Sequence, residues 1–213
     1  MPLTKPQTEV IKEKSRFRVL ITGRRFGKTY LAINELAKFA SKSNQKVWYV
    51  APTYRQAKQI VWTELKQKLI EHKWVKNINH SDLTFLLKNN STITLRGSDN
   101  ENALRGVGIN FLVIDEFADV SKEAWYEVLR PTLSDTGGHA LFCGSPRGFG
   151  NWSYELFKQG ETNKDWSSFK FTTLEGGQVS KKEIEQAKQD LDIRTFQQEY
   201  EATFVNYSGM IYY

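Results

Sequence analysis

RVLITGRRFGKT, at residues 18–29, joins a short apolar run to a loop that ends in Gly-Lys-Thr, and an amphipathic segment follows it. A strand, a loop and a helix in this order are the context in which a phosphate-binding P-loop works. The backbone N–H groups of such a loop, and the N-terminus of the helix after it, bind phosphate. In that role Lys28 reaches the β- and γ-phosphates of a nucleotide, and the Thr29 hydroxyl is a ligand for Mg²⁺.

The loop departs from the P-loop consensus G-x-x-x-x-G-K-[ST] at its first position. Thr22 stands where the consensus has glycine, and Gly23 follows one place later. Arg24 and Arg25 also lie inside the loop, which is unusual for P-loops in general. On this motif alone, a chance Gly-Lys-Thr turn is therefore an alternative.

A second motif argues against that alternative. Residues 111–114 are four consecutive apolar residues, which is typical of a strand buried on both faces of a parallel sheet. Asp115 then lies at the carboxyl end of the strand, where open α/β sheets bind their ligands. One carboxylate there can hold Mg²⁺ through water, and the adjacent Glu116 can orient and polarise an attacking water. For this segment taken alone, a solvated acidic turn is the simpler alternative.

Length and composition indicate one domain, or one domain with an appendage. The 213 residues are enough to bury a sizeable core. The single cysteine, Cys143, lies in an apolar run, so we expect a buried strand residue in a reducing compartment. The polar N-terminus indicates no signal peptide, and no apolar stretch reaches membrane-spanning length. The three histidines are scattered without ligand spacing, so we expect no structural metal site.

Charge is distributed unevenly along the chain. Residues 1–60 contain 13 Lys and Arg against 3 Asp and Glu, whereas residues 101–213 contain 11 against 17. A basic half suits phosphate or nucleic-acid partners, although ordinary solvated surface accounts for it equally well. A further hypothesis is that the basic face of one copy meets the acidic face of the next in a ring. Assembly that is insensitive to salt would contradict it.

Apolar periodicity and turn residues predict alternating strands and helices. Thr4-x-x-Gln7 has the form of a capping box that opens a helix to about Lys14. Ser121 is predicted to cap a helix that Pro131 ends. The predicted strands are 17–22, 47–51, 83–87, 92–96, 111–115, 139–144 and 167–172, and the other predicted helices are 28–41, 54–71, 151–159, 181–191 and 193–204. This alternation predicts an α/β fold with a largely parallel sheet.

On these residues the chain resembles the ATPase domain of the large terminase subunit of tailed bacteriophages, the motor that packages DNA into the capsid. The resemblance runs from Gln7 to about Phe204. Its most specific part is the loop at 22–29, because a non-glycine first position and loop arginines are usual in that family. The order of Val-Ala-Pro-Thr at 50–53, Asp-Glu at 115–116 and Gly-Ser-Pro at 144–146 is similar too.

The resemblance implies a RecA-like P-loop ATPase of the additional-strand, catalytic-glutamate type, with a mostly parallel sheet flanked by helices. The ATPase core would span residues 1–172, and a small C-terminal lid subdomain would span residues 173–213. The family's large subunit continues into a nuclease domain. We therefore expect the chain, which stops at residues 209–213, to be the motor domain of a longer protein.

The resemblance also implies a role for each matching residue. Thr29 and Asp115 would hold Mg²⁺, and Glu116 would be the catalytic glutamate. Ser145 would sense the γ-phosphate and couple hydrolysis to movement, although a plain turn before a proline is an alternative. The residues implied to bind ATP are Gln7, Thr22, Gly23, Arg24, Arg25, Phe26, Gly27, Lys28 and Thr29. Gln7 would read the adenine edge, a role that competes with its place in the capping box and is compatible with it.

Arginine supplies transition-state charge in phosphoryl transfer, in cis or from a neighbouring subunit. Arg24 and Arg25 are the candidates in cis. Arg105 resembles the position from which the family supplies an arginine to the next subunit, and Arg96 is the second choice. A contact to DNA phosphate, or a tether for its own loop, is the simpler role for Arg105.

The partners implied are double-stranded DNA, other copies of the chain in a ring, the portal protein and the small terminase subunit, with no membrane. The implied location is the host cell cytoplasm, with transient docking on the viral procapsid. Three alternatives remain at the level of sequence. The first is a helicase-like motor, which usually needs two RecA-like modules. The second is a small-molecule kinase, which would phosphorylate an acceptor. The third is a non-hydrolysing nucleotide-switched DNA-binding or scaffold module, which would gain nothing from Glu116.

Overall fold

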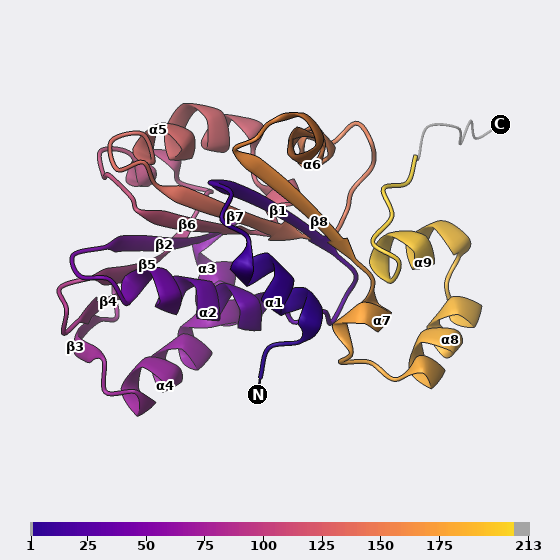
Figure 1. Ribbon diagram of the computed structural model, residues 1–213, viewed down its shortest axis with the longest axis horizontal. Coiled ribbons are helices and arrows are strands. Elements are labelled where there is room, and N and C mark those ends of the chain that lie inside the picture. The colour runs from indigo at the N-terminus through magenta and orange to yellow at the C-terminus, as the bar shows by residue number, and fades with distance from the viewer. Residues whose placement is uncertain (1, 207–213) are drawn as a thin grey trace. The chain divides into compact units, whose positions relative to one another are not determined.

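The computed structural model describes residues 2–206, and of residue 102 it describes the backbone alone. The chain divides into two compact units. The first comprises the chain up to Lys28 and from Cys143 onward, and the second comprises Thr29–Phe142. The strands of the described residues form an 8-stranded sheet in the order β3-β4-β5-β2-β6-β7-β1-β8 (Figure 1). Residues 209–213, where the sequence ends, lie outside the described residues.

The first unit is built around two parallel strands that lie far apart in the sequence. β1 pairs with β8 in parallel, from Phe17 opposite Trp166 to Thr22 opposite Phe171. All six residues of β1 are buried, and α6 packs on both strands. The elements of this unit are α1 (Lys5–Lys12), β1 (Phe17–Thr22), α6 (Trp152–Thr162), β8 (Trp166–Phe171), α7 (Thr173–Gly176), α8 (Lys181–Asp190) and α9 (Ile193–Glu199).

The second unit combines parallel and antiparallel strands. β2 pairs in parallel with both β5 and β6, whereas β3, β4 and β5 form antiparallel pairs. Its strands are β2 (Lys46–Ala51), β3 (Val75–Asn79), β4 (Thr84–Leu87), β5 (Thr92–Gly97) and β6 (Phe111–Asp115). Its helices are α3 (Tyr54–Ala57), the π-helix η1 (Lys58–Trp62), α4 (Thr63–Glu71), the 3₁₀ turns η2 (Glu101–Leu104) and η3 (Phe117–Asp119), the π-helix η4 (Ala124–Leu129) and α5 (Arg130–Thr132).

Two further elements cross the boundary between the units along the chain. α2 (Lys28–Ala40) begins at the last residue of the first segment of unit one, and β7 (His139–Gly144) ends in its second segment. No helix among residues 2–206 is long and apolar enough to cross a membrane.

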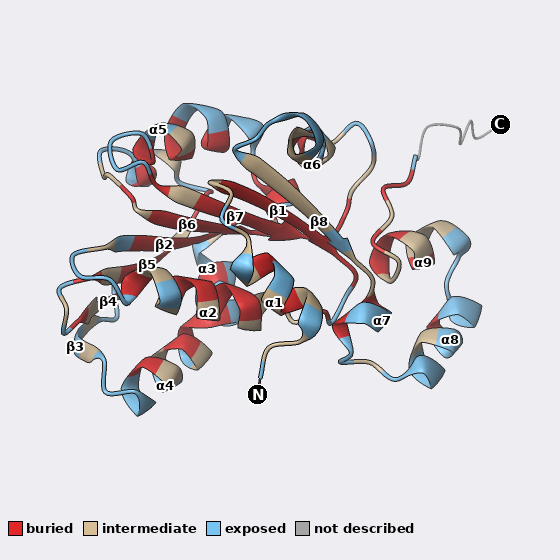
Figure 2. Ribbon diagram, in the orientation of Figure 1, coloured by how far each residue is buried: buried red, intermediate tan, exposed pale blue. Residues whose placement is uncertain are grey.

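The core of each unit follows from its apolar strands, as the red strands in Figure 2 show. All five residues of β6 are buried, and so are five of the six in β2. In the second unit, Phe39 of α2 stacks on Phe111 of β6 with 3.9 Å between ring centroids and 3° between ring planes. Trp125 meets Phe142 edge-on at 4.7 Å. Such aromatic pairs add ~0.5–1.5 kcal/mol beyond the burial of their surface.

The predicted α/β class is confirmed, and so are most elements. The strands predicted at 17–22, 111–115 and 139–144 have the observed bounds. The capping box is also present, because the Thr4 hydroxyl accepts a hydrogen bond from the Gln7 backbone N–H and the Gln7 side chain accepts one from the Thr4 backbone. The division of the chain at residue 172 into core and lid stays a prediction.

Some helices differ from the sequence prediction. The helix predicted at 54–71 is interrupted by the π-helix η1, and a π-turn has no composition of its own by which to be recognised. The Ser121 hydroxyl caps the next helix by accepting from the Ala124 N–H at 3.0 Å. The helical residues then continue without a break through η4 and α5 and end at Thr132. The predicted end at Pro131 is therefore correct to within one residue.

Two further differences, a strand that was not predicted and a helix that was predicted too long, have their cause in packing. β3 was not predicted, because its sequence Val-Lys-Asn-Ile-Asn buries neither apolar residue fully. The helix predicted at 193–204 ends at Glu199. Beyond it, Ala202 has a φ of 54°, and the Phe204 ring packs against Tyr154 and Phe157 at centroid distances of 4.9 and 5.5 Å. The chain therefore leaves the helix to bury this ring.

Candidate nucleotide-binding site

The predicted P-loop connects β1 to α2 in the expected way. Thr22 ends β1, and Lys28 is the first residue of α2. Thr22 has strand geometry and no positive φ, so a β-branched residue fits where the consensus has glycine. Gly27 has a φ of 92°, a conformation that glycine adopts without strain. Lys28 and Thr29 thus stand in the first turn of a helix, whose N-terminus favours anions.

Gln7 connects this loop to the first helix of the chain. Its side chain is buried, and its Nε2 donates to the carbonyl oxygens of Phe26 at 3.2 Å and Gly27 at 3.3 Å. Its Oε1 accepts from the Thr4 N–H at 3.0 Å. A Cβ on Gly27 would lie 2.6 Å from the Gln7 Nε2, so the glycine also makes room for this contact. Gln7 therefore has a structural role in both α1 and the loop, and its contact to adenine stays a prediction.

The start of the loop is fixed by the last residue of β8 and by residues that follow this strand. The Gly23 N–H donates to the Phe171 carbonyl at 3.0 Å, and the Arg24 N–H donates to the Glu199 carbonyl at 2.7 Å. The Thr173 hydroxyl donates to the Arg24 carbonyl at 2.8 Å. The Arg24 Nε also donates to the Glu199 carboxylate at 2.5 Å. Arg24 therefore contacts the segment at 173–200 through its backbone and its side chain.

The middle of the loop is anchored by a buried ring. Phe26 is fully buried and stacks on Phe171 with 5.5 Å between centroids and 7° between planes. A Cβ on Gly176 would lie 2.8 Å from the Phe26 Cα, so α7 approaches the loop closely. Arg25, by contrast, is exposed and has a φ of 58°. It presents a long side chain to solvent, as does Arg24, whose side chain is 67% exposed.

Replacing Gly23 by Ala tests the contacts that fix the start of the loop. The new Cβ would lie 2.5 Å from the Thr173 Oγ1, 2.6 Å from the Thr173 N and 2.6 Å from the Tyr200 O. Because two of these atoms are backbone, we expect the free energy of unfolding to fall by ~1–3 kcal/mol. Gly150→Ala is the control, since nothing lies within 4 Å of its Cβ position, and it should change stability by less than ~0.5 kcal/mol. Equal urea midpoints for the two variants would show that these contacts are absent.

The acidic pair follows β6 in the second unit. Asp115 is the last residue of β6 and only 3% exposed. Its Oδ2 accepts a hydrogen bond of 2.5 Å from the Tyr49 hydroxyl, and its Oδ1 accepts one of 3.1 Å from the Glu116 N–H. Glu116 has a left-handed backbone with φ 46° and ψ 43°. Non-glycine residues with this backbone conformation are found more often at functional sites than elsewhere.

The candidate arginines have different surroundings. Arg105 is exposed and lines a hollow of about 340 Å³, which Glu127 and Asp135 also line. Arg96 lies over the ring of buried Trp48, with 5.6 Å from its guanidinium carbon to the ring centroid. Which of the two arginines serves a neighbouring subunit stays a prediction.

Two further residues lie at the end of β7. Cys143 is buried inside that strand, as its apolar sequence context predicted. Ser145 is buried directly after the strand. Its sensing of the γ-phosphate stays a prediction.

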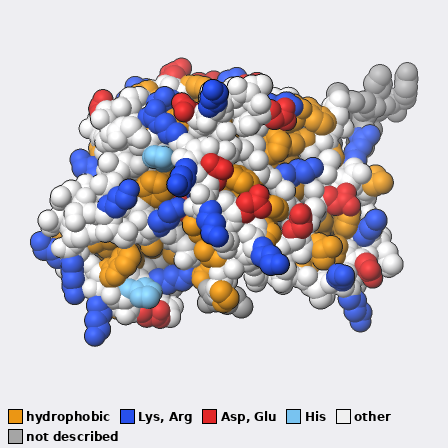
Figure 3. All heavy atoms as spheres, viewed as in Figure 1, with side chains coloured by type: hydrophobic (Ala, Val, Ile, Leu, Met, Phe, Trp, Pro, Cys, Tyr) orange, Lys and Arg blue, Asp and Glu red, His pale blue; other side chains and the backbone are white. Residues whose placement is uncertain are grey.

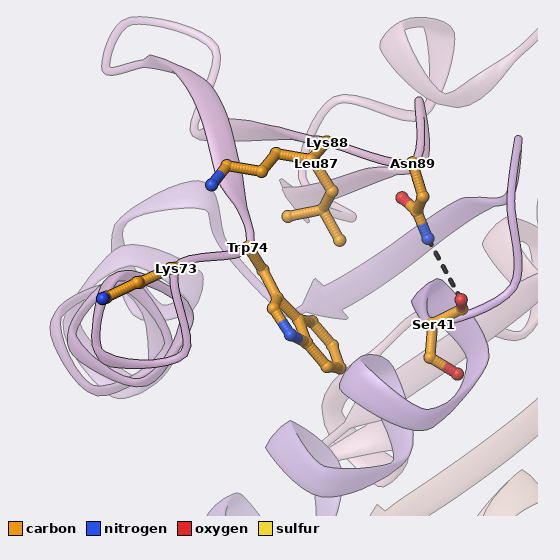
Figure 4. A pocket seen from close by; sticks show the side chains of 6 residues that line it. All are labelled: Ser41, Lys73, Trp74, Leu87, Lys88 and Asn89. Carbon is orange, nitrogen blue, oxygen red and sulfur yellow. Dashed lines mark hydrogen bonds between the residues drawn. The ribbon is translucent and has the colours of Figure 1, made fainter.

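A second hollow, of about 270 Å³, lies elsewhere in the second unit. It is lined by Ser41, Lys73, Trp74, Leu87, Lys88 and Asn89 (Figure 4). Asn89 donates to the Ser41 carbonyl at 3.1 Å, which ties the β4–β5 turn to the end of α2. This hollow lies near the amino end of β2, whereas open α/β sheets bind ligands at the carboxyl ends. We therefore do not assign the nucleotide to it.

Basic side chains near that hollow are exposed. Lys73 and Lys88 line the hollow and are exposed, and Lys76 of β3 is exposed as well. Figure 3 shows Lys and Arg side chains along the edge where β3 lies. They agree with the basic character of the first half of the chain. Because acidic residues also occur in the same stretch of sequence, at 64–88, ordinary solvated surface accounts for this distribution as well.

The structure adds residues that the motifs did not reveal. Tyr49, Thr173 and Glu199 contact the predicted site residues directly. The only sequence signal for Tyr49 was its position in a predicted strand. Thr173 and Glu199 fall in the segment that the resemblance assigned to a lid, where no single residue was singled out.

The residues present fit a divalent ion of the kind expected. The oxygen donors available for it are the Asp115 carboxylate and the Thr29 hydroxyl, which are of the type that Mg²⁺ prefers. Among the described residues, no group of three or more His, Cys, Asp or Glu could hold a metal ion by itself. Mg²⁺ would therefore need phosphate and water as further ligands.

The chain has a P-loop between a buried strand and a helix, and an Asp-Glu pair follows another buried strand in a sheet of this order. Together these features define the class of P-loop ATPase domains. The family model for the terminase large subunit, T4likevirus-type, N-terminal, matches residues 19–213. The large terminase subunit of Escherichia phage T5 is 31% identical over 216 residues, which cover 97% of this chain and 49% of that protein.

Solved structures agree with this match. The large terminase ATPase domain of Thermus phage P74-26 has a TM-score of 0.82 at 25% identity, over 96% of this chain and 94% of that one. The large terminase of another thermophilic bacteriophage, in complex with ADP, has the same fold, with a TM-score of 0.81 at 19% identity over 96% of this chain and 54% of that one. The chain belongs to the terminase large subunit family, and it corresponds to the ATPase domain. It spans about half the length of the curated relatives that it matches.

Proposed function

We propose that this domain hydrolyses ATP with Mg²⁺, and that the protein uses the cycle to move double-stranded DNA into a viral procapsid. The observation that carries the proposal is the geometry of the loop at 22–29. Gly27 turns the backbone with a φ of 92°, so that Lys28 and Thr29 begin α2. One structure of the second thermophilic phage terminase holds ADP and another holds ATP-gamma-S, which supports nucleotide binding by this fold.

Each residue of the site then has a task in hydrolysis. The loop N–H groups and Lys28 bind the phosphates and neutralise the charge that develops on them. Glu116 orients and polarises the attacking water. Thr29 and Asp115 would hold Mg²⁺, which would supply positive charge that offsets the negative charge of the phosphates. The Ser145 hydroxyl, directly after β7, would sense the γ-phosphate and couple its presence to the sheet.

Among the arginines, the proposal assigns the trans role to Arg105. Arg24 is already bound to Glu199 in an ion pair of 2.5 Å, so it would have to leave that carboxylate to reach a phosphate in cis. Arg25 is the other candidate in cis. Arg105 is exposed and is therefore available to a neighbouring copy, as a ring of subunits requires.

The wider setting of the proposal follows from the family. The partners are double-stranded DNA, further copies of the chain in a ring, the portal protein and the small terminase subunit. The site of action is the host cytoplasm, with docking on the procapsid. A protein that joins this domain to a nuclease domain would also be an endonuclease, and no residue of this chain is assigned to that activity.

Phosphate release from ATP, measured over a series of protein concentrations, tests the shared site. We expect the specific activity to rise with concentration, and Arg105→Ala to lower it by about 10³-fold. Mixing Arg105→Ala with Glu116→Gln subunits should restore activity, because an intact Glu116 then meets an intact Arg105. Arg55→Ala, which removes another exposed arginine of the second unit, is the control and should leave the rate unchanged.

Two results would contradict this arrangement. Activity that is independent of concentration, with no rescue on mixing, would exclude a shared site while leaving hydrolysis itself in place. Phosphate found on an acceptor, with none released to water, would exclude the ATPase and favour a kinase.

A further inference from the structure

We propose that Tyr49 is a positioning residue for the Mg²⁺-binding carboxylate of Asp115 and, through it, for Glu116. This inference rests on the proposed ATPase function and names a residue that neither motif contains. Tyr49 lies on β2, the strand next to β6, and it is fully buried. It acts on the reaction only through Asp115.

The register of the two strands explains the contact. Tyr49 lies opposite Val113, and Asp115 is two residues further along β6. Because side chains alternate along a strand, Val113 and Asp115 stand on the same side of the sheet as Tyr49. The long phenol side chain spans the offset of two residues, and its hydroxyl donates to the Asp115 Oδ2 at 2.5 Å.

The carboxylate is held at both oxygens. Tyr49 donates to Oδ2, and the Glu116 backbone N–H donates to Oδ1 at 3.1 Å. Rotation of the carboxylate about its own axis would break both bonds, so its plane is fixed. A carboxylate that is oriented in advance needs no reorganisation when it accepts from metal-bound water.

The same hydrogen bonds connect Tyr49 to Glu116. The Glu116 backbone is left-handed, with φ 46° and ψ 43°. This conformation is unfavourable for residues other than glycine. The Glu116 N–H donates to Asp115, and its carbonyl accepts from the Asp119 N–H at 2.9 Å. These two bonds support the turn from which the Glu116 side chain departs. Without the Tyr49 hydroxyl, the carboxylate loses the bond at Oδ2, and one support of that strained turn is weakened.

A purely structural role is the competing explanation. A buried phenol needs an acceptor, and Asp115 supplies one whether or not the site binds metal. The two explanations differ in what they predict for metal-dependent binding. A structural hydroxyl affects stability alone, whereas a positioning hydroxyl affects the part of ATP affinity that depends on Mg²⁺.

The test is Tyr49→Phe in this chain, which keeps the buried ring and removes the hydroxyl. The dissociation constant of a fluorescent ATP analogue is measured in Mg²⁺ and in EDTA, alongside the melting temperature. We expect affinity in Mg²⁺ to fall about tenfold, as for other outer-shell supports of metal ligands, and affinity in EDTA to stay unchanged. Tyr54→Phe is the matched control, because it removes a phenol hydrogen bond of 2.7 Å to the Ser81 carbonyl in the same unit.

A second background tests whether Tyr49 acts through the Asp115 carboxylate. In an Asp115→Asn background, adding Tyr49→Phe should cause no further loss of Mg²⁺-dependent affinity, since both changes act through one carboxylate. Equal, additive losses in the two backgrounds would overturn the proposal.

The remaining outcomes also decide between the explanations. A lower melting temperature with an unchanged ratio of the two affinities would assign Tyr49 to the core alone. If the unsubstituted chain binds the analogue equally in Mg²⁺ and in EDTA, and releases no phosphate, the proposed function itself fails and this inference with it.

Discussion

Replacing Glu116 by Gln is expected to reduce the rate of ATP hydrolysis by about 10²- to 10⁴-fold, the usual contribution of a positioned general base. Glutamine has the size of glutamate but cannot accept the proton of the attacking water. The affinity for Mg-ATP should stay close to that of the unsubstituted chain, because Lys28, Thr29 and Asp115 are retained. Single-turnover phosphate release and equilibrium nucleotide binding, measured on the same preparation, check the two halves of this expectation.

The matched control is Glu123→Gln, which removes an exposed carboxylate a short way further along the chain. It should leave both the rate and the affinity unchanged. If Glu116→Gln hydrolyses ATP at the unsubstituted rate, the catalytic assignment is wrong. If it fails to bind Mg-ATP, the left-handed turn at Glu116 serves binding, and its role as the base is again unsupported.

The second large effect is expected for Lys28→Ala. The lysine is the first residue of α2, and its ammonium group would contact the β- and γ-phosphates, where charge develops in the transition state. Removing one such preorganised group typically lowers kcat by about 10²- to 10³-fold. Unlike Glu116→Gln, this variant should also bind ATP more weakly. Steady-state kinetics would show both changes, in kcat and in KM.

Lys42→Ala provides the comparison, since Lys42 is exposed just beyond the other end of α2. It should behave as the unsubstituted chain. Circular dichroism of both variants excludes unfolding as the cause of any loss. A Lys28→Ala protein with normal kinetics would mean that the Gly-Lys-Thr sequence is a structural turn and that the nucleotide binds elsewhere.

The sequence alone predicted those parts of the fold that depend on neighbouring residues. Apolar runs marked β1, β6 and β7 with their observed bounds, because buried parallel strands contain few polar residues. The capping box at Thr4 and Gln7 was predictable because both partners lie within one turn of helix. The loop at 22–29 and the Asp115–Glu116 pair were found in the same way, as short motifs with a fixed spacing.

The parts that could not be predicted depend on contacts between distant residues. The bond from Tyr49 to Asp115 joins positions 66 apart, and the ion pair of Arg24 with Glu199 joins positions 175 apart. Neither pair has a local pattern. The bonds of the Gln7 side chain to the carbonyls of the loop were missed for the same reason. The π-helices and the edge strand β3 were missed because short irregular elements have weak compositional signals.

The pairing of β1 with β8 has a consequence for how the protein is made on the ribosome. The strand that leads into the phosphate-binding loop is synthesised first, but its partner, from Trp166 to Phe171, emerges much later. The loop's other supports, Thr173 and Glu199, emerge later still. Long-range pairing is slow, and it cannot begin before the intervening chain has been synthesised. A nascent chain that stopped before β8 would therefore contain the loop sequence at 22–29 but lack the contacts that fix the loop for phosphate binding. If the loop binds nucleotide as proposed, binding would report that β8 and the segment to Glu199 have been synthesised and have reached the loop.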